Sequence, residues 1–352
     1  MPDRRTTAFR AVMDALHLVR AHRLPGGRLA RGRGFALTLH HVRPAAEAGF
    51  APNHLLEVTP GFLDMTIRHV RAAGYEFVDL DEAWARLTAQ GERPPFCTLT
   101  FDDGYRDFVD YALPVLRRHR APAALFVASA FADATGDLWW LTLEEVLRRA
   151  TSLEVDLGQG PERFDTLDSP AKARAWDCVM KRLKAMPEDR MRAIIAGLAA
   201  EYGIDGRRLV AAECLSWDDL VPVARDPLVT IGAHTVNHYM LAKWPAEVVT
   251  QELERSRRDI REKLGMLPRH VAFPVGDPGA AGRREFEIAR LLGFTTAWTT
   301  RAGHLFSAHR EYPTALPRVS LNGHFQAPRY LDLFVAGTPF LLWNRGRKLN
   351  VA

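Results

Sequence analysis

The chain has 352 residues, of which 47% are hydrophobic and 25% are charged. This is the composition of a globular protein and excludes a disordered chain, and the length suits one large α/β domain or two ordinary domains. The sequence contains no run of about 18 apolar residues, so a transmembrane helix is not expected. Charged residues interrupt every apolar stretch near the start, so we find no secretory signal peptide and expect a cytoplasmic protein.

The formal net charge is +5, and basic residues are densest between Arg20 and Arg33. We interpret residues 1–34 as a solvated basic arm; contact of this arm with anionic lipid or with nucleic acid is the alternative. Nucleic-acid binding is not expected, because no aromatic residues interleave with the basic ones. The three cysteines lack CxxC spacing, and we expect them to be reduced, buried thiols. They are Cys97, Cys178 and Cys214.

Short apolar and β-branched runs alternate with longer helical patterns, which is typical of repeated β-α units. Several runs are almost entirely apolar, as expected of strands that are covered on both faces in a parallel sheet. Eight such strands favour a closed (β/α) barrel over an open sheet. The predicted strands are Phe35–His40, Tyr75–Val78, Phe96–Phe101, Ala123–Val127, Val229–Gly232, His270–Pro274, Thr295–Thr299 and Arg318–Leu321. The predicted helices between them are Pro60–Gly74, Asp107–His119, Pro245–Leu264 and Arg283–Leu292.

The stretch from Asp137 to Arg225 interrupts this alternation, because it contains helical patterns and no convincing strand. We interpret residues 137–225 as a helical insertion within a catalytic domain of residues 35–335. Three tryptophans flank the insertion; we expect them to pack in its core, and a sugar-stacking platform formed by one of them is the alternative. They are Trp139, Trp140 and Trp217. The helical patterns cover Thr142–Ala150, Ser169–Ala185 and Glu188–Tyr202.

Residues 336–352 are interpreted as a C-terminal tail. The apolar segment Leu331–Trp343 precedes the basic sequence Arg345-Gly346-Arg347-Lys348. This combination suits either a peripheral contact with a membrane surface or a terminal helix that closes the barrel, and we favour the helix.

Two adjacent carboxylates follow one predicted strand directly. The sequence Thr100-Phe101-Asp102-Asp103-Gly104 places both aspartates at the carboxyl end of a buried strand, where ligands bind in parallel α/β folds. Neighbouring ionised aspartates repel each other, and a metal ion or a shared proton relieves that repulsion. An Asx-turn with aspartate at a helix N-cap is the structural alternative.

Two histidines follow another predicted strand. His234 and His238 are four residues apart, so both imidazoles would project from one face if a helical turn starts there, which suits a shared metal ion. Thr235 stands where an HExxH motif has glutamate, so a zincin mechanism is not supported. A histidine pair and an aspartate pair, each after a buried strand, together supply two nitrogens and one oxygen and leave positions open for water and substrate.

The motifs TFDDG and HTVNH together resemble those of the polysaccharide deacetylases of carbohydrate esterase family 4, the NodB-homology domain. The resemblance extends from about Phe35 to Phe325. Four weaker motifs share it, and they are Leu37–Val42, Ala272–Gly276, Gly293–Ala297 and Leu316–Val319. It implies a distorted (β/α) barrel and a divalent metal ion, most commonly zinc, bound by Asp103, His234 and His238.

The resemblance also implies the catalytic roles. Asp102 would be the general base that takes a proton from the attacking water, and a histidine would protonate the leaving amine. Tyr105, through its backbone N–H, and Pro274 would contact the substrate. Many members end in Leu-x-His, and here the nearest form is Leu321-Asn322-Gly323-His324, so His324 is our candidate general acid. The rival histidines are His40, His41 and His304.

One departure concerns the third motif, in which many members carry an arginine that orients the catalytic aspartate. Here no arginine matches that position beside Pro274, and the register of Arg269 does not fit. The sequence therefore leaves open how Asp102 is oriented.

The resulting hypothesis is a metal-dependent hydrolase that removes N-acetyl groups from an N-acetylated sugar polymer or oligosaccharide. An O-acetyl esterase acting on an exopolysaccharide and a catalytically silent carbohydrate-binding protein with the same fold are the alternatives. For a cytoplasmic enzyme, a precursor made inside the cell would be the natural substrate.

Overall fold

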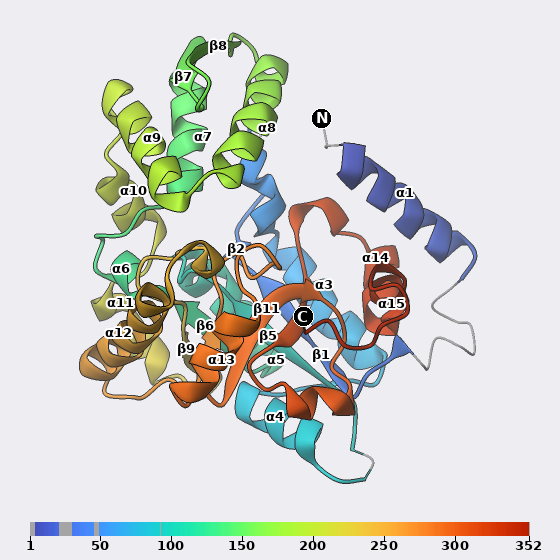
Figure 1. The fold of residues 1–352 in the computed structure, drawn as a ribbon. Helices are drawn as coiled ribbons and strands as arrows, with labels where there is room; N and C mark the ends of the chain where they lie inside the picture. The colour runs from blue at the N-terminus through green and yellow to red at the C-terminus, as the bar shows by residue number, and fades with distance from the viewer. Residues whose placement is uncertain (1–3, 21–29, 46–48, 92, 352) are drawn as a thin grey trace.

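The computed structural model describes residues 4–20, 30–45, 49–91 and 93–351. A barrel of parallel strands lies at its centre, with helices around it (Figure 1). The ring runs in the order β1-β12-β11-β10-β9-β6-β5 and closes because β5 also pairs with β1. Its strands are β1 (Gly34–Leu39), β5 (Phe96–Phe101), β6 (Ala123–Val127), β9 (Val229–Ala233), β10 (His270–Ala272), β11 (Thr296–Ala302) and β12 (Leu316–Ser320). The predicted distorted (β/α) barrel is confirmed.

The eighth predicted strand lies outside the closed ring. Strand β4 (Glu76–Phe77) pairs only with Phe96 and Cys97, because β6 occupies the same edge of β5 from Leu99 onward. Helix α4 (Leu80–Thr88), which the sequence analysis missed, follows β4 and packs its buried residues against the side chains inside the barrel. The ring therefore has seven strands in the described part of the chain, not eight.

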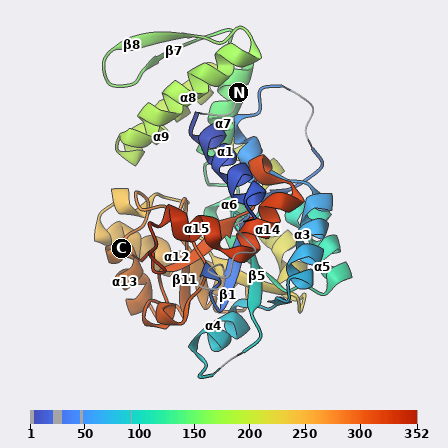
Figure 2. The same ribbon diagram turned by 90° about the vertical axis from the view of Figure 1, so that its right-hand side faces the viewer.

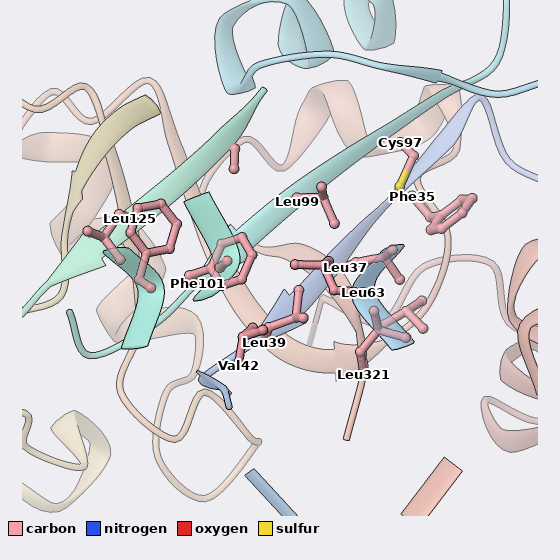
Figure 3. Packing of buried hydrophobic residues seen from close by; sticks show 14 of the residues in the cluster. Phe35, Leu37, Leu39, Val42, Leu63, Cys97, Leu99, Phe101, Leu125 and Leu321 are labelled. Atoms are coloured by element: carbon pink, nitrogen blue, oxygen red, sulfur yellow. The ribbon is translucent and has the colours of Figure 1, made fainter. Parts of the chain in front are cut away.

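The strands are buried on both faces, which explains their continuous apolar runs. On β1, Phe35, Leu37 and Leu39 face outward into the layer of helices, beside Leu63 of α3 (Pro60–Ala72) (Figure 3). Residues on the opposite face fill the barrel interior. The apolar ones include Ala36, Phe96, Ala124, Phe126, Ala272, Trp298 and Leu316.

Most predicted helices are present within two residues of their expected bounds. In α3 the side chain of Thr59 accepts a hydrogen bond from the Phe62 N–H, and α12 ends at Gly265 in the left-handed conformation. The helix predicted at Asp107–His119 begins instead with a π-helical turn, because Pro114 has no N–H to donate to the preceding turn. The π-helical turn is Phe108–Ala112, and the outer helices are α5 (Leu113–His119), α12 (Ala246–Leu264) and α13 (Arg283–Leu291).

The insertion projects from the barrel as a separate layer with its own apolar cluster (Figure 1). Trp139 and Trp140 are buried in that cluster, as the core-packing interpretation predicts, while Trp217 packs against the barrel's own core. The insertion is not purely helical. Strands β7 (Ser152–Asp156) and β8 (Pro161–Asp165) form an antiparallel hairpin in which Leu153 and Val155 alternate with exposed residues. The helices from β6 to β9 are α6 (Ser129–Ala132), α7 (Trp139–Arg149), α8 (Ser169–Ala185), α9 (Glu188–Glu201), α10 (Gly206–Glu213) and α11 (Trp217–Ala224).

The two ends of the chain pack against each other (Figure 2). Helix α1 (Arg4–Leu18) contacts α14 (Pro328–Ala336) and buries Met13, so this part of the basic arm is an ordered helix. Residues 21–29 of the arm lie outside the described residues. Helix α15 (Thr338–Trp343) follows α14. Short elements complete the fold: strands β2 (His41–Val42) and β3 (Glu57–Val58), and 3-10 turns Pro52–Leu56, Leu241–Lys243, Ser307–Glu311 and Gly323–Phe325.

Most of the apolar C-terminal segment is buried within the protein. Leu331, Leu333, Phe334 and Phe340 join the main hydrophobic cluster, which agrees with a terminal helix that packs on the barrel. In the described part of the chain, no helix has the length and apolar character needed to span a bilayer. A cytoplasmic location and a peripheral membrane contact stay predictions. Cys97 and Cys214 are buried thiols, but Cys178 is exposed, contrary to expectation, because it lies on the outer face of α8.

Two glycine substitutions test the packing of the barrel. A Cβ atom at Gly232 would lie 2.3 Å from the ring of the buried Phe126, whereas Gly61, at the start of α3, has open space. We expect Gly232→Ala to destabilise the protein by about 1–3 kcal/mol through overpacking. Gly61→Ala should be neutral or stabilise it by up to about 1 kcal/mol. Urea unfolding measures both changes, and equal effects of the two variants would contradict the barrel packing described here.

Candidate metal centre and active site

The two adjacent aspartates point to different partners because the chain turns sharply after β5. Asp103 has a φ of 73° and Gly104 a φ of 71°, both in the left-handed region. Asp102 thereby faces the barrel interior, while Asp103 faces the loop that follows β9. Both side chains are only 2% exposed. Asp102 pairs with an arginine and not with a helix N-terminus, so the N-cap alternative does not describe it.

Asp103, His234 and His238 converge on one buried point. The Oδ1 atom of Asp103 lies 3.2 Å from Nε2 of His234 and 3.1 Å from Nε2 of His238. These atoms form a group that could hold a metal ion, and no second group of this kind occurs among the described residues. Zinc bonds of about 2.0–2.2 Å would place tetrahedral ligand atoms roughly 3.3–3.5 Å apart, which is close to the observed separations.

Hydrogen bonding supports a cation at this point. Nδ1 of His234 lies 2.7 Å from the carbonyl oxygen of Ala272, which only accepts, so Nδ1 carries the proton and Nε2 of the neutral ring presents a lone pair. Oδ1 of Asp103 is buried and forms no hydrogen bond of good geometry. Burial lowers the pKa of His234, but the nearby Asp103 and Asp102 carboxylates raise it more. A proton or a divalent ion therefore has to neutralise this cluster, and the donor set fits zinc.

The histidine pair does not lie on a helical turn, contrary to the sequence-based expectation. Residues 234–238 form a loop in which Thr235 has a φ of 64° and His238 a φ of 55°. The left-handed residues fold the loop back, so that the two imidazoles meet with ring centroids 4.9 Å apart. The expected convergence is therefore present, but the backbone that produces it is different.

Glu252 of α12 holds this loop from the barrel side. Its carboxylate accepts hydrogen bonds from the N–H groups of Val236 and Asn237 at 3.0 and 2.8 Å, and from the Asn237 side chain at 2.6 Å. In the sequence Glu252 resembles any glutamate of a surface helix. No local pattern could have identified it, and the sequence analysis missed it.

Arg318 orients the side chain of Asp102. Its guanidinium forms two hydrogen bonds of 2.7 Å with the two carboxylate oxygens of Asp102 and is completely buried. Thr100 and the carbonyl of Thr299 accept further bonds from the same guanidinium. Burial raises the pKa of Asp102, but the charge of Arg318 and the neighbouring His234 lower it more, so its pKa lies below the ordinary carboxyl value. The arginine missing from the third motif is thus replaced by one from β12.

The four histidines considered as general acids lie in different places. His40, at the end of β1, is close enough to Asp103 and Asp102 for their charges to raise its pKa against the larger lowering by burial. His41 is paired with Asp107 at 2.6 Å and stacks on Tyr105. His304 is buried under α14, and desolvation lowers its pKa to about 4.

His324 is placed away from the aspartates. Its ring contacts those of His54 and Phe325. Burial lowers its pKa, and the neighbouring positive charges that add to this effect are His54 and Arg10. These contacts do not connect His324 with Asp102, and its role as the general acid stays a prediction.

The two predicted substrate contacts lie beside the candidate metal centre. Tyr105 follows the aspartates directly and is buried, with its hydroxyl oxygen 3.2 Å from Nε1 of Trp140. Pro274 lies just beyond β10, two residues after the carbonyl of Ala272 that orients His234. Both residues belong to the candidate site, and their contact with a substrate stays a prediction.

The Arg318–Asp102 pair gives a prediction about stability. Arg318→Met leaves a buried carboxylate without its counter-ion, so we expect a loss of about 3–5 kcal/mol in the free energy of unfolding. Arg310→Met is the control, because its pair with Glu311 is more than half exposed and should contribute less than about 1 kcal/mol. Urea unfolding at neutral pH measures both. Equal losses in the two variants would show that the buried pair contributes no more to the free energy of unfolding than an exposed pair.

Comparison with known proteins supports the same site residues. The family model of the polysaccharide deacetylases matches residues 89–159 and 170–297, which is more than half of the chain and includes Asp102, Asp103, His234 and His238. None of the curated proteins matches this sequence.

Two solved structures show the same fold at low sequence identity. IcaB from Ammonifex degensii is 18% identical, with 86% of this chain and 97% of that chain covered and a TM-score of 0.53. The putative polysaccharide deacetylase BA0330 from Bacillus anthracis is 14% identical, with 86% and 68% covered and a TM-score of 0.54. The family match, the barrel and the buried aspartate and histidine motifs lead to one conclusion: this chain belongs to the polysaccharide deacetylase family.

Proposed function

We propose that this deacetylase is a metal-dependent hydrolase that removes N-acetyl groups from an N-acetylated sugar polymer or oligosaccharide. The observation that carries the proposal is the buried meeting of Asp103, His234 and His238 beside the separately paired Asp102. Two nitrogens and one carboxylate oxygen form a site typical of catalytic zinc, which keeps open positions for water and substrate. A divalent ion held there supplies Lewis-acid chemistry: it makes a water molecule more acidic and polarises the carbonyl group.

Asp102 is suited to act as the general base. Its lowered pKa keeps it ionised at neutral pH, so it can take a proton from the attacking water. The Oδ1 atom of the carboxylate still has a free lone pair after bonding to Arg318, because a carboxylate oxygen can accept two hydrogen bonds, whereas Oδ2 also accepts one from the Thr38 hydroxyl at 3.5 Å. The bidentate pair also fixes the plane of the carboxylate, which orients the remaining lone pairs.

His40 is the histidine best placed to protonate the leaving amine. It is partly exposed at the end of β1, where burial lowers its pKa and the charges of the nearby Asp103 and Asp102 oppose that lowering. A partly exposed imidazole can exchange protons with solvent and reach a substrate held above the barrel. We therefore place His40 ahead of His324 as the general acid.

Two alternatives share the same residues. An O-acetyl esterase would use the same base and metal ion on an ester, whose better leaving group needs less help from an acid. A silent carbohydrate-binding protein would bind metal and sugar without turnover. The ionised Asp102, held by two hydrogen bonds from Arg318, favours a catalyst over a silent protein, because sugar binding alone does not need a buried base.

Acetate release tests the proposed hydrolase. N-acetylglucosamine oligomers and O-acetylated glycans are incubated with protein that has been stripped of metal and reloaded with zinc or cobalt. We expect metal-dependent acetate release that falls by at least about 100-fold in Asp102→Asn, because the base is lost. His234→Ala should lose the acetate release that depends on added metal. The exposed Asp110→Asn should behave as wild type. Sugar binding without any acetate release would instead support the silent protein.

A second pair of variants identifies the acid. We expect His40→Ala to lower kcat by about 100-fold or more on amide substrates, because the leaving amine is no longer protonated. His324→Ala should retain most of the activity. Bound metal is measured in both variants to separate proton transfer from metal loss. A large fall in kcat for His324→Ala alone would restore His324 as the acid.

A further inference from the structure

The helical insertion contacts the loop that carries both histidine ligands, here called the metal loop (residues 234–244). We propose that helix α9 of the insertion holds this loop in its metal-binding conformation, with Glu188 and Arg192 as positioning residues for His238. The inference rests on the proposed metal-dependent function and assigns the insertion a part in it.

Arg192 binds the backbone of the metal loop at His238 itself. Its Nη2 atom lies 3.1 Å from the carbonyl oxygen of His238 and 3.3 Å from that of Asn237. The guanidinium also lies 4.9 Å from the ring centroid of Tyr239, the next residue of the loop. One side chain of the insertion therefore contacts three consecutive residues of the loop.

Glu188 binds the next part of the loop. One carboxylate oxygen accepts the backbone N–H of Met240 at 2.7 Å and the indole N–H of Trp244 at 2.9 Å. The other oxygen pairs with Arg192, one helical turn along α9, at 2.8 and 3.0 Å. The Glu188 side chain is completely buried, so its charge requires these partners. Glu188 thus accepts hydrogen bonds from N–H groups of the loop, and Arg192 donates hydrogen bonds to its carbonyl oxygens.

Aromatic rings of the same region enclose the His238 imidazole. The ring of Trp140, on α7 of the insertion, lies 4.9 Å from it, and that of Phe131 lies 5.7 Å from it. Nδ1 of His238 is buried and has no hydrogen-bond partner, unlike Nδ1 of His234. The orientation of His238 therefore depends on packing and on the backbone, whereas that of His234 is fixed by a hydrogen bond.

The backbone of His238 needs such support. A non-glycine residue in the left-handed region costs about 1–3 kcal/mol, and both His238 and Thr235 adopt that conformation. Glu252 of α12 holds the first half of the loop, at Val236 and Asn237. The contacts of Glu188 and Arg192 begin where those of Glu252 end. Arg284 of α13 also donates to the carbonyl oxygens of Leu241 and Trp244, so the loss of Glu188 and Arg192 releases mainly residues 238–240 and lets His238 withdraw from Asp103.

A matched control lies in the same insertion. Arg182 of α8 pairs with Glu162 of the hairpin at 2.6 Å, and the pair contributes to the insertion without touching the metal loop. Arg182→Ala therefore measures the effect of losing an ion pair of the insertion. Arg192→Ala removes the contact with the loop, and Arg192→Lys keeps the charge beside the buried Glu188 but not the forked guanidinium, so it is the variant more certain to fold.

Two measurements on purified full-length protein test the proposal. The first is hydrogen exchange of residues 234–244 in metal-free protein. The second is zinc affinity by competition with a chromophoric chelator, together with the absorption spectrum of bound Co²⁺. We expect faster exchange in both Arg192 variants, zinc binding weakened by about 10–100-fold and a changed Co²⁺ spectrum. Arg182→Ala should match wild type in all three, even if its melting temperature falls.

The outcomes separate this inference from the proposed function. Loop exchange and zinc affinity that are unchanged in the Arg192 variants, or changed equally in Arg182→Ala, would overturn the positioning role. Wild-type protein that binds neither zinc nor Co²⁺ would refute the metal-dependent function. In that case, faster exchange confined to the Arg192 variants would still support the role of α9 in holding the loop, and unchanged exchange would overturn it.

Discussion

The guanidinium of Arg318 and the carboxylate of Asp102 are both removed from water inside the barrel, where an unpaired charge would cost several kcal/mol. Their pairing gives two neighbouring aspartates different chemistry. Asp102 has a permanent counter-ion, which lowers its pKa and keeps the proposed base ionised without a metal ion. Asp103 instead faces the imidazoles of His234 and His238, so its charge is suited to a cation held with them. The different surroundings of the two aspartates, and the different roles proposed for them, thus depend on one arginine of β12.

Much of this arrangement could be predicted from the sequence because it depends on strands. The carboxyl ends of parallel strands meet at one end of a barrel, so Asp103, after β5, and His234, after β9, had to lie near each other. The partner of Asp102 could not be predicted in this way. Arg318 is 216 positions away in the chain and stands within a strand that reads as apolar. Only the closure of the ring brings it beneath the aspartate.

The remaining surprises come from buried charges and short elements. Glu188 and Glu252 have the sequence context of ordinary helix residues, and their burial depends on which backbone groups of a distant loop face them. The hairpin β7–β8 has only five residues in each strand, too short for its alternation to stand out among helices. The insertion was recognisable as a separate segment, but its contact with the metal loop is a tertiary property that no local pattern carries.

The closure of the ring also has a consequence for synthesis of the chain, because the ring closes only when its last strand is present. Strand β1 pairs with β5 on one side and with β12 on the other, so a chain that is still being translated has an open sheet until residues 316–320 leave the ribosome. Until then Asp102 has no Arg318 beside it, although the three candidate metal-binding residues have already been made. A chain that ended before β12 would carry the complete aspartate and histidine motifs and still lack the arginine that orients Asp102. The orientation of Asp102 therefore requires the last strand of the barrel.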